Sequence, residues 1–125
     1  MLVNYTSTYQ KIAMGLLSFV PELKEIDHLT EQMNWYESQE SQKLLLWKDE
    51  DTDNFIGLIG LEVNDKNILI RHLVISPSFR GEKLVFELLN QLEAEYPDSV
   101  FTGTIETSLI LAKWNQEKLK ENERE

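Results

Sequence analysis

The sequence predicts an α+β fold in which helices flank a central mixed β-sheet. Three apolar runs at 43–48, 55–63 and 68–76 are separated only by the polar turns "DEDTDN" and "NDKN", which indicates an antiparallel meander. Two segments with the apolar spacing of amphipathic helices precede this meander, and two follow it. A short apolar run at 99–105 lies between the last two helices. This order predicts a sheet with both antiparallel and parallel pairs.

The N-terminal third predicts one short strand and two helices. "MLVNY" is typical of a strand over 1–5. A helical pattern of apolar residues covers 9–17, and Gly15 together with "SFVPE" predicts that this helix ends early. After Pro21, apolar residues lie near one face of a second helix over 23–40.

The C-terminal half predicts a strand, a helix and a strand in succession. Leucine spacing predicts a helix over Leu84–Tyr96, which must end before Pro97. This helix connects the strands at 68–76 and 99–105, so we expect these two strands to be parallel neighbours. A last helix is expected from 107 to about 121, followed by a charged, solvated end.

The composition restricts the partners of the chain. Its net charge of -10 disfavours nucleic acid and anionic membranes, and no apolar run is long enough to span a bilayer. The absence of Cys fits a cytoplasmic protein without disulfides. The two histidines, His28 and His72, do not have metal-ligand spacing, so no metal site is expected. Because no linker or repeat interrupts the chain, we expect a single domain over 1–125.

One stretch has the pattern of an anion site. "HLVISPSFRGEKLVFELLNQL" at 72–92 is typical of a strand, a turn and an amphipathic helix. The first turn of a helix has unpaired N–H donors and the positive end of the helix dipole, and Arg80 and Lys83 add charge there. The sequence therefore predicts that the start of this helix holds a phosphate or a similar anion.

The same stretch resembles a known family. "IRHLVISPSFRGEKL" is similar to motif A of the GNAT acetyltransferases, in which an apolar strand leads through an Arg-Gly turn into a helix. The element order resembles the GNAT fold over nearly the whole chain. More narrowly, "KIAMGLLSF", "LLLWKDED" and "IRHLVISPSFR" resemble the small RibT-like proteins of bacterial riboflavin-synthesis operons.

The resemblance implies that acetyl-CoA is the cofactor. The backbone of the strand would pair with the pantetheine arm, and the N–H groups of the turn and helix would bind the pyrophosphate. The residues implied are Leu73, Val74 and Ile75 for the arm, and Arg80, Gly81, Glu82, Lys83, Leu84 and Val85 for the pyrophosphate. Lys83 and Val85 stand where the family has glycines, and a Val side chain could crowd a phosphate. We therefore expect weak binding of acetyl-CoA.

Two functional classes remain open. The first is an acetyl-CoA-dependent N-acetyltransferase acting on a small-molecule or protein amine, with a link to riboflavin synthesis. In that class His72 and Glu62 are the candidate catalytic bases, and Arg71 meets a phosphate or carboxylate or else pairs with Glu62 across the hairpin. The second is a GNAT-like binding or regulatory protein without catalysis. It is favoured by Ala112, which stands where the family often has a tyrosine on the last helix.

A homodimer is also expected. The resemblance implies two further strands after the last helix, and because the charged tail at that place is not typical of strands we expect a GNAT-like sheet that is truncated C-terminally. The strand at 99–105 would therefore lie near an open edge, which recruits a partner or must be covered. Leu109, Ile110, Leu111 and Trp114 form an apolar segment nearby. The last strand and helix are the predicted interface.

Overall fold

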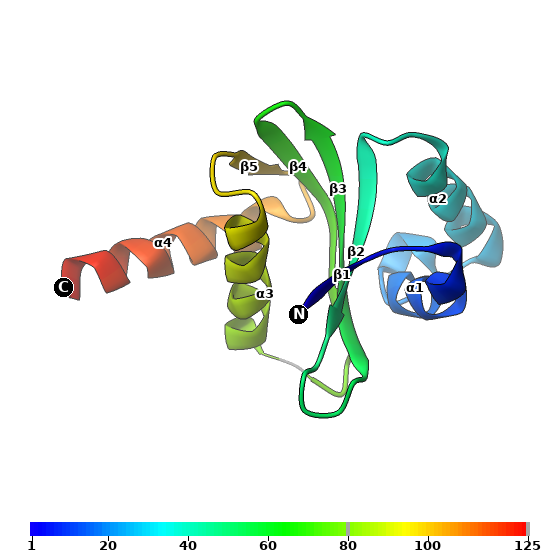
Figure 1. Ribbon diagram of the computed structural model, residues 1–125, viewed down its shortest axis with the longest axis horizontal. Coiled ribbons are helices and arrows are strands. Elements are labelled where there is room, and N and C mark those ends of the chain that lie inside the picture. Colours follow the sequence, from blue (N-terminus) through cyan, green and yellow to red (C-terminus); the bar gives the residue numbers. More distant parts are fainter. Residues whose placement is uncertain (80, 125) are drawn as a thin grey trace.

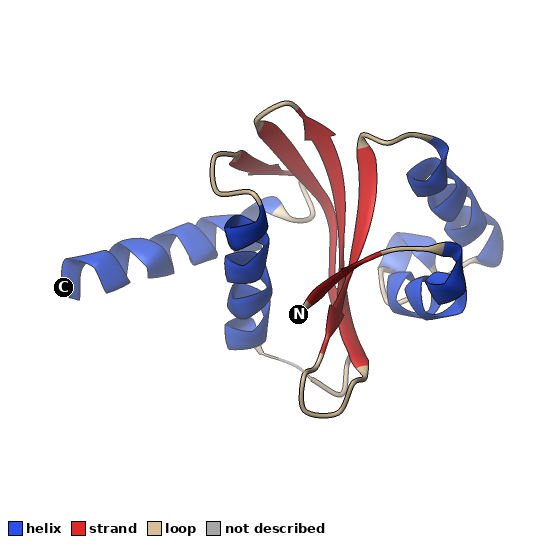
Figure 2. Cartoon of the chain, viewed as in Figure 1, coloured by secondary structure: helices blue, strands red, loops and turns tan. Residues whose placement is uncertain are grey.

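The chain forms a five-stranded sheet with two helices on each face (Figure 1). The computed structural model describes residues 1–79 and 81–124. The elements, in order, are β1 (Leu2–Asn4), η1 (Ser7–Tyr9), α1 (Gln10–Leu17), η2 (Pro21–Leu23), α2 (Ile26–Ser38), β2 (Gln42–Lys48), β3 (Phe55–Asn64), β4 (Asn67–Ile75), α3 (Glu82–Glu95), β5 (Val100–Gly103) and α4 (Ser108–Arg124). Figure 2 shows α1 and α2 on one side of the sheet, and α3 and α4 on the other.

The predicted fold class and topology are confirmed. The strands follow one another in the sheet in chain order, β1 to β4 pair antiparallel, and β4 pairs parallel with β5. The helix α3 makes the crossover between these parallel neighbours. The second helix begins at Ile26, later than predicted, because Pro21–Leu23 form the separate turn η2.

The sheet is buried on both faces, which explains the unbroken apolar run in β2. Leu44 and Leu46 pack in the core cluster beneath α1 and α2, whereas Leu45 packs in the cluster beneath α3 and α4. Successive side chains of a strand point to opposite faces, so a strand covered on both sides carries apolar residues at every position. The continuous apolar run "LLLW" is therefore explained by side chains that pack alternately into the cores on the two faces of the sheet.

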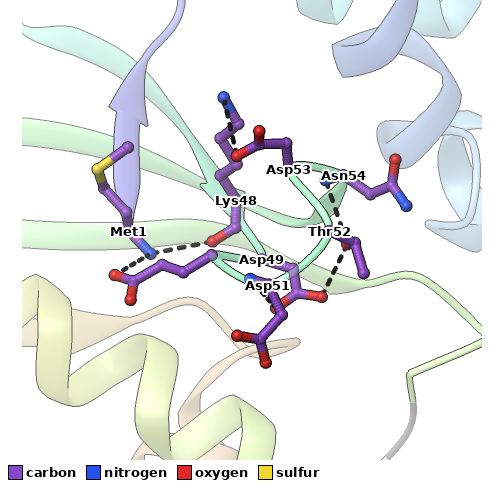
Figure 3. Close-up of polar contacts among 8 residues, drawn as sticks. Met1, Lys48, Asp49, Asp51, Thr52, Asp53 and Asn54 are labelled. Carbon is purple, nitrogen blue, oxygen red and sulfur yellow. Dashed lines mark hydrogen bonds and ion pairs between the residues drawn. The ribbon is translucent and has the colours of Figure 1, made fainter.

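The turn between β2 and β3 is polar and closed by its own side chains (Figure 3). The Thr52 hydroxyl donates to Asp49 Oδ2 at 2.8 Å, and the Asp49 N–H donates to the Asn54 carbonyl at 2.8 Å. Asp53 has a φ of 60°, a left-handed conformation that Asp tolerates better than most residues. The N-terminal amine of Met1 donates to the Lys48 carbonyl at 3.0 Å, which ties β1 to this turn.

A β-bulge interrupts the pairing of β3 with β4. Gly60 is paired with His72 and Leu61 with Ile70, so Arg71 is the extra residue. Without the bulge, residue 72 would share a face with Ile70. Ile70 instead packs in the α3/α4 core, while Val74 packs in the α1/α2 core. The bulge therefore turns the second half of β4, including His72, toward α1 and α2.

The strand β5 leaves β4 halfway along its length. β5 pairs only with Asn67–Ile70, so within the described residues the rest of β4 has a strand partner on the β3 side alone. At the point of separation the Thr107 hydroxyl donates to the Ile70 carbonyl at 2.8 Å. This separation opens the sheet at the place where the site is built.

Candidate active site

A cavity of about 460 Å³ lies where β5 separates from β4. The second half of β4 forms its floor, the segment between α1 and α2 forms one wall, and the turn before α4 forms another. The lining residues are Phe19, Val20, Pro21, Glu22, Leu23, Gln32, Arg71, His72, Leu73, Val74, Ile75, Thr104, Glu106 and Thr107. The cavity thus joins three segments that are far apart in the sequence.

Two threonines fix the wall that precedes α4. The Thr104 N–H donates to Thr107 Oγ1 at 2.9 Å, and the Thr107 N–H donates to Thr104 Oγ1 at 3.3 Å. This reciprocal pair is a capping box, with Thr in place of the usual Glu or Gln. Glu106 lies exposed in the capped turn. Its own backbone N–H and the Thr104 hydroxyl hold the pKa of its carboxyl below the ordinary value, so it is a carboxylate at neutral pH.

His72 forms a buried pair with Tyr36 of α2. The Tyr36 hydroxyl lies 2.5 Å from His72 Nδ1, and the Tyr36 side chain is buried. Burial, and next the positive charge of Arg71, lower the pKa of His72 to about 4, so its imidazole is neutral at neutral pH. A Cβ at Gly60 would overlap the Tyr36 hydroxyl, so the pair needs glycine at this position.

Arg71 forms an ion pair with Glu62, which is one of the two alternatives that the sequence left open for this arginine. Arg71 Nη1 lies 3.5 Å from Glu62 Oε2, and the guanidinium lies over the Trp35 ring at 4.7 Å from its centroid. Arg71 and His72 line the cavity, but Glu62 is not among its lining residues. The structure thus brings one of the two candidate bases, His72, into the cavity and leaves Glu62 in an ion pair beside it.

The start of α3 is built on a glycine with an unusual backbone conformation. Gly81 has a φ of 139°, which residues with a side chain rarely adopt. The first helical hydrogen bond of α3 runs from the Val85 N–H to the Gly81 carbonyl. The backbone N–H groups of Glu82, Lys83 and Leu84 therefore have no acceptor within the helix. They are available to an anion. Arg80, also predicted here, lies outside the described residues.

Comparison with known proteins identifies the family. A model of the acetyltransferase (GNAT) family matches residues 10–117. The chain belongs to the GNAT acetyltransferase family. A relative named as an uncharacterized N-acetyltransferase in the lysA 3' region of Bacillus methanolicus is 38% identical over 114 residues, which cover 90% of this chain and 93% of the relative.

Solved GNAT structures share the fold. An aminoglycoside N-acetyltransferase in complex with CoA has a TM-score of 0.67 at 11% identity, with 94% of this chain and 84% of that chain covered. A GNAT family acetyltransferase from Staphylococcus aureus has a TM-score of 0.64 at 18% identity, with 82% and 83% covered. A spermidine N-acetyltransferase chimera from Vibrio cholerae and hSSAT has a TM-score of 0.58 at 18% identity and 74% coverage of this chain, which spans only 61% of the chimera.

In this GNAT chain, the predicted cofactor residues within the described part of the chain lie in the second half of β4 and at the start of α3. Leu73, Val74 and Ile75 line the cavity along the part of β4 that β5 does not pair. Val85 packs against the core cluster beneath α3. Its side chain is thus part of the core packing, which argues against the predicted crowding of a phosphate.

Several site residues of this GNAT chain were missed by the sequence reasoning. Tyr36, Glu106 and the segment Phe19–Leu23 were assigned to helices or loops without a site role. The Thr-x-x-Thr spacing of Thr104 and Thr107 is a recognisable capping signature that could have been found. Within residues 1–79 and 81–124, no group of His, Asp and Glu could hold a metal, and no helix has the length and apolar character of a membrane span.

Proposed function

We propose that the protein is an acetyl-CoA-dependent N-acetyltransferase that acetylates a small amine bound in the cavity. The observation that carries this proposal is the separation of β5 from β4, which leaves the backbone of Leu73–Ile75 along a cavity that also contains His72. A pantetheine arm can pair with such a strand edge as an added strand does. The test is release of free CoA from acetyl-CoA in the presence of a panel of amines. Absence of release with every amine would contradict the proposal.

The cofactor would span β4 and α3. The pantetheine arm would lie along Leu73–Ile75, and the pyrophosphate would accept hydrogen bonds from the first turn of α3. Arg80 is included in this proposal as a pyrophosphate-binding residue, and only the sequence supports its role. The net charge of -10 opposes a polyanionic ligand, so binding should be weak and should rest on short-range donors.

Binding of acetyl-CoA should depend on Gly81. A Gly81→Ala change places a Cβ on a residue with a φ of 139°, which costs about 1–3 kcal/mol of backbone strain. The first turn of α3 would relieve this strain by a shift of its backbone, which would move its N–H donors. We expect acetyl-CoA affinity to fall by about 10-fold in calorimetric titration, as about 1.4 kcal/mol of that strain corresponds to this factor. Because the attraction between the phosphates and the positive end of α3 is Coulombic, the wild-type affinity should also fall as salt rises.

The matched control for this change is Gly15→Ala. A Cβ at Gly15, within α1, meets nothing within 4 Å, and the residue has no positive φ. This variant should bind acetyl-CoA as the wild type does. Equal affinities for Gly81→Ala and Gly15→Ala would show that the start of α3 does not contact the cofactor.

The lining of the cavity favours a cationic acceptor. Phe19, Val20 and Leu23 form an apolar wall, while Glu22 and Glu106 supply carboxylates. The charge of Arg71 is offset by its ion pair with Glu62. The two carboxylates thus leave the cavity with an excess of negative charge, which an amine with a second positive charge would complement. The neighbours named for aminoglycosides and spermidine make those two amines the first to test.

The acceptor panel should also include amine-bearing precursors of riboflavin. The resemblance of "KIAMGLLSF", "LLLWKDED" and "IRHLVISPSFR" to RibT-like proteins supports a link to that pathway. Turnover of such a precursor would support the link. If the enzyme acetylates other amines but none of these precursors, the proposed link to riboflavin synthesis is contradicted.

Neutralising Glu106 should weaken binding of a cationic amine. Glu106 is fully exposed to solvent, so its attraction is screened, and Glu106→Gln should raise the KM of a dicationic amine by about 2- to 5-fold. The KM of acetyl-CoA should not change. Glu121→Gln makes the same change on an exposed part of α4 outside the cavity and should leave both values unchanged. Equal effects of the two substitutions would contradict a role for Glu106.

A second candidate function is a GNAT domain that binds acetyl-CoA without transferring its acetyl group. Ala112 supports this candidate, because it lies exposed on α4 at the place where the resemblance implies a tyrosine. Saturable binding of acetyl-CoA without CoA release across the amine panel would favour this candidate over the transferase.

The edge of the sheet supports a proposed homodimer. β5 is an edge strand, and Val100, Ile105 and Leu109 near it are 59%, 93% and 67% exposed. Leu111 and Trp114, which the sequence placed in the interface, are buried in the chain's own core. We expect light scattering at high micromolar concentration to give the mass of a dimer, and Leu109→Asp to give that of a monomer. A monomeric wild type would contradict the proposal.

A further inference from the structure

The pair of Tyr36 and His72 has a consequence for the chemistry of the cavity, and it rests on the proposed transferase function. We infer that Tyr36 is a positioning residue that holds His72 as the neutral tautomer with its proton on Nε2. His72 then acts as a hydrogen-bond donor to the acetyl oxygen and not as the base that deprotonates the amine.

The hydrogen-bond inventory of the pair selects this tautomer. A tyrosine hydroxyl has one proton, and a neutral imidazole has one N–H and one acceptor nitrogen. If the His72 Nδ1–H donated to Tyr36, the Tyr36 proton would need another acceptor. Among the described residues, His72 is the hydrogen-bond partner found for this hydroxyl. A buried donor without an acceptor costs about 1–3 kcal/mol, so donation from the Tyr36 hydroxyl to Nδ1 is favoured.

The protonation state of Tyr36 agrees with its role as donor. Burial, as the largest cause, raises the pKa of Tyr36 above its ordinary value, so the hydroxyl keeps its proton at neutral pH. His72 is neutral under the same conditions. With Nδ1 accepting from Tyr36, the remaining proton of the imidazole is on Nε2. Because His72 lines the cavity and Nδ1 faces Tyr36, Nε2 is the ring nitrogen available to a ligand.

Two backbone features make this arrangement possible. The bulge at Arg71 turns His72 to the face that α2 covers, and Gly60 opposite His72 leaves room for the Tyr36 hydroxyl. The charged groups that act on the pair come from three other places. Arg71 is its neighbour on β4, Glu62 lies on β3, and Glu106 lies in the turn before α4. In the described part of the chain, the Tyr36 hydroxyl and His72 Nδ1 are hydrogen-bonded to each other and not to any of these three side chains.

The donor has a defined place in the transfer. The lone pair of a neutral amine forms the new C–N bond to the thioester carbon, and the carbonyl π electrons move to oxygen. The His72 Nε2–H donates to this oxyanion. When the oxyanion collapses, the C–S bond breaks, CoA leaves as a thiolate, and the proton of the attached amine passes to the thiolate or to water. His72 begins and ends the cycle with the same proton.

The tautomer can be observed without any activity. In nitrogen-15 NMR of the histidine side chains, a protonated ring nitrogen and an unprotonated one have clearly different shifts, and coupling to the ring protons assigns each. We expect His72 of the wild type to carry its proton on Nε2 at neutral pH. Tyr36→Phe should yield a mixture of the two His72 tautomers. The control is Tyr9→Phe, which should leave the spectrum of His72 unchanged because the Tyr9 ring packs against Phe55. A wild-type proton on Nδ1 would overturn the inference.

Kinetics then separate a donor from a base. Gln at position 72 retains an N–H donor but cannot take up a proton, so His72→Gln should keep at least about 10-fold more kcat than His72→Ala, within the loss expected for one donor. Tyr36→Phe should lower kcat with little change in the KM of acetyl-CoA. Equal losses in the Gln and Ala variants would overturn the inference in favour of a base. If no variant or wild type has activity, the proposed function fails, and the NMR result still decides the tautomer.

Discussion

Replacing His72 with Ala should lower kcat by about 100- to 1,000-fold, the loss typical of one oxyanion donor. His72 lines the cavity, and its hydrogen bond to Tyr36 fixes the ring in one orientation. Because the proposed cofactor contacts come from the backbone of Leu73–Ile75 and from α3, the affinity for acetyl-CoA should change little. Steady-state kinetics with calorimetric titration of acetyl-CoA measure the two quantities separately.

The control for this prediction is His28→Ala. His28 lies exposed on α2 and does not line the main cavity. It should retain wild-type kcat. Wild-type turnover in the His72 variant, or an equal loss of turnover in the His28 variant, would contradict a role for His72 in the reaction.

Replacing Thr107 with Val should lower the free energy of unfolding by about 2–4 kcal/mol. The substitution keeps the shape of the side chain but removes the hydroxyl that donates to the Ile70 carbonyl and accepts from the Thr104 N–H. Each buried polar group left without a partner costs about 1–3 kcal/mol, and loss of a helix cap costs about 1 kcal/mol. Urea unfolding with a constant m-value measures the change.

The matched control is Thr107→Ser, which keeps the hydroxyl and loses the methyl group. Loss of one buried methyl group should cost about 1 kcal/mol. The Val variant should therefore be the less stable of the two. If Thr107→Ser is as unstable as Thr107→Val, packing and not the hydroxyl holds the turn before α4 to β4.

Local patterns in the sequence were enough to predict most of the fold. The meander follows from apolar runs that short polar turns separate, and the parallel pair of β4 and β5 follows from the helix between them. Gly81 was predicted as the turn before α3, and its φ of 139° explains why a glycine stands there. The turns and helices depend on neighbouring residues, and the parallel pair follows from the general rule for a strand–helix–strand crossover, so the sequence alone was enough to predict them.

The composition of the cavity depends on register and was only partly predictable. His72 faces α2 because of the bulge at Arg71, and a bulge depends on how β3 and β4 pair. The contact between Tyr36 and His72 joins residues 36 positions apart and requires the space above Gly60. Glu62 was predicted as a base because it was expected among the polar groups nearest the thioester, and this role stays a prediction. The structure pairs Glu62 with Arg71, one of the two alternatives left open for that arginine.

The central claim is that acetyl-CoA binds across the unpaired part of β4 and the start of α3. A titration of the nitrogen-15-labelled protein with acetyl-CoA, followed by backbone amide NMR, tests it most directly. We expect saturable shifts that are largest at Leu73–Ile75 and at 81–85, with smaller shifts at β1 and at the β2–β3 turn. An absence of shifts at millimolar acetyl-CoA, or shifts confined to other parts of the chain, would contradict it.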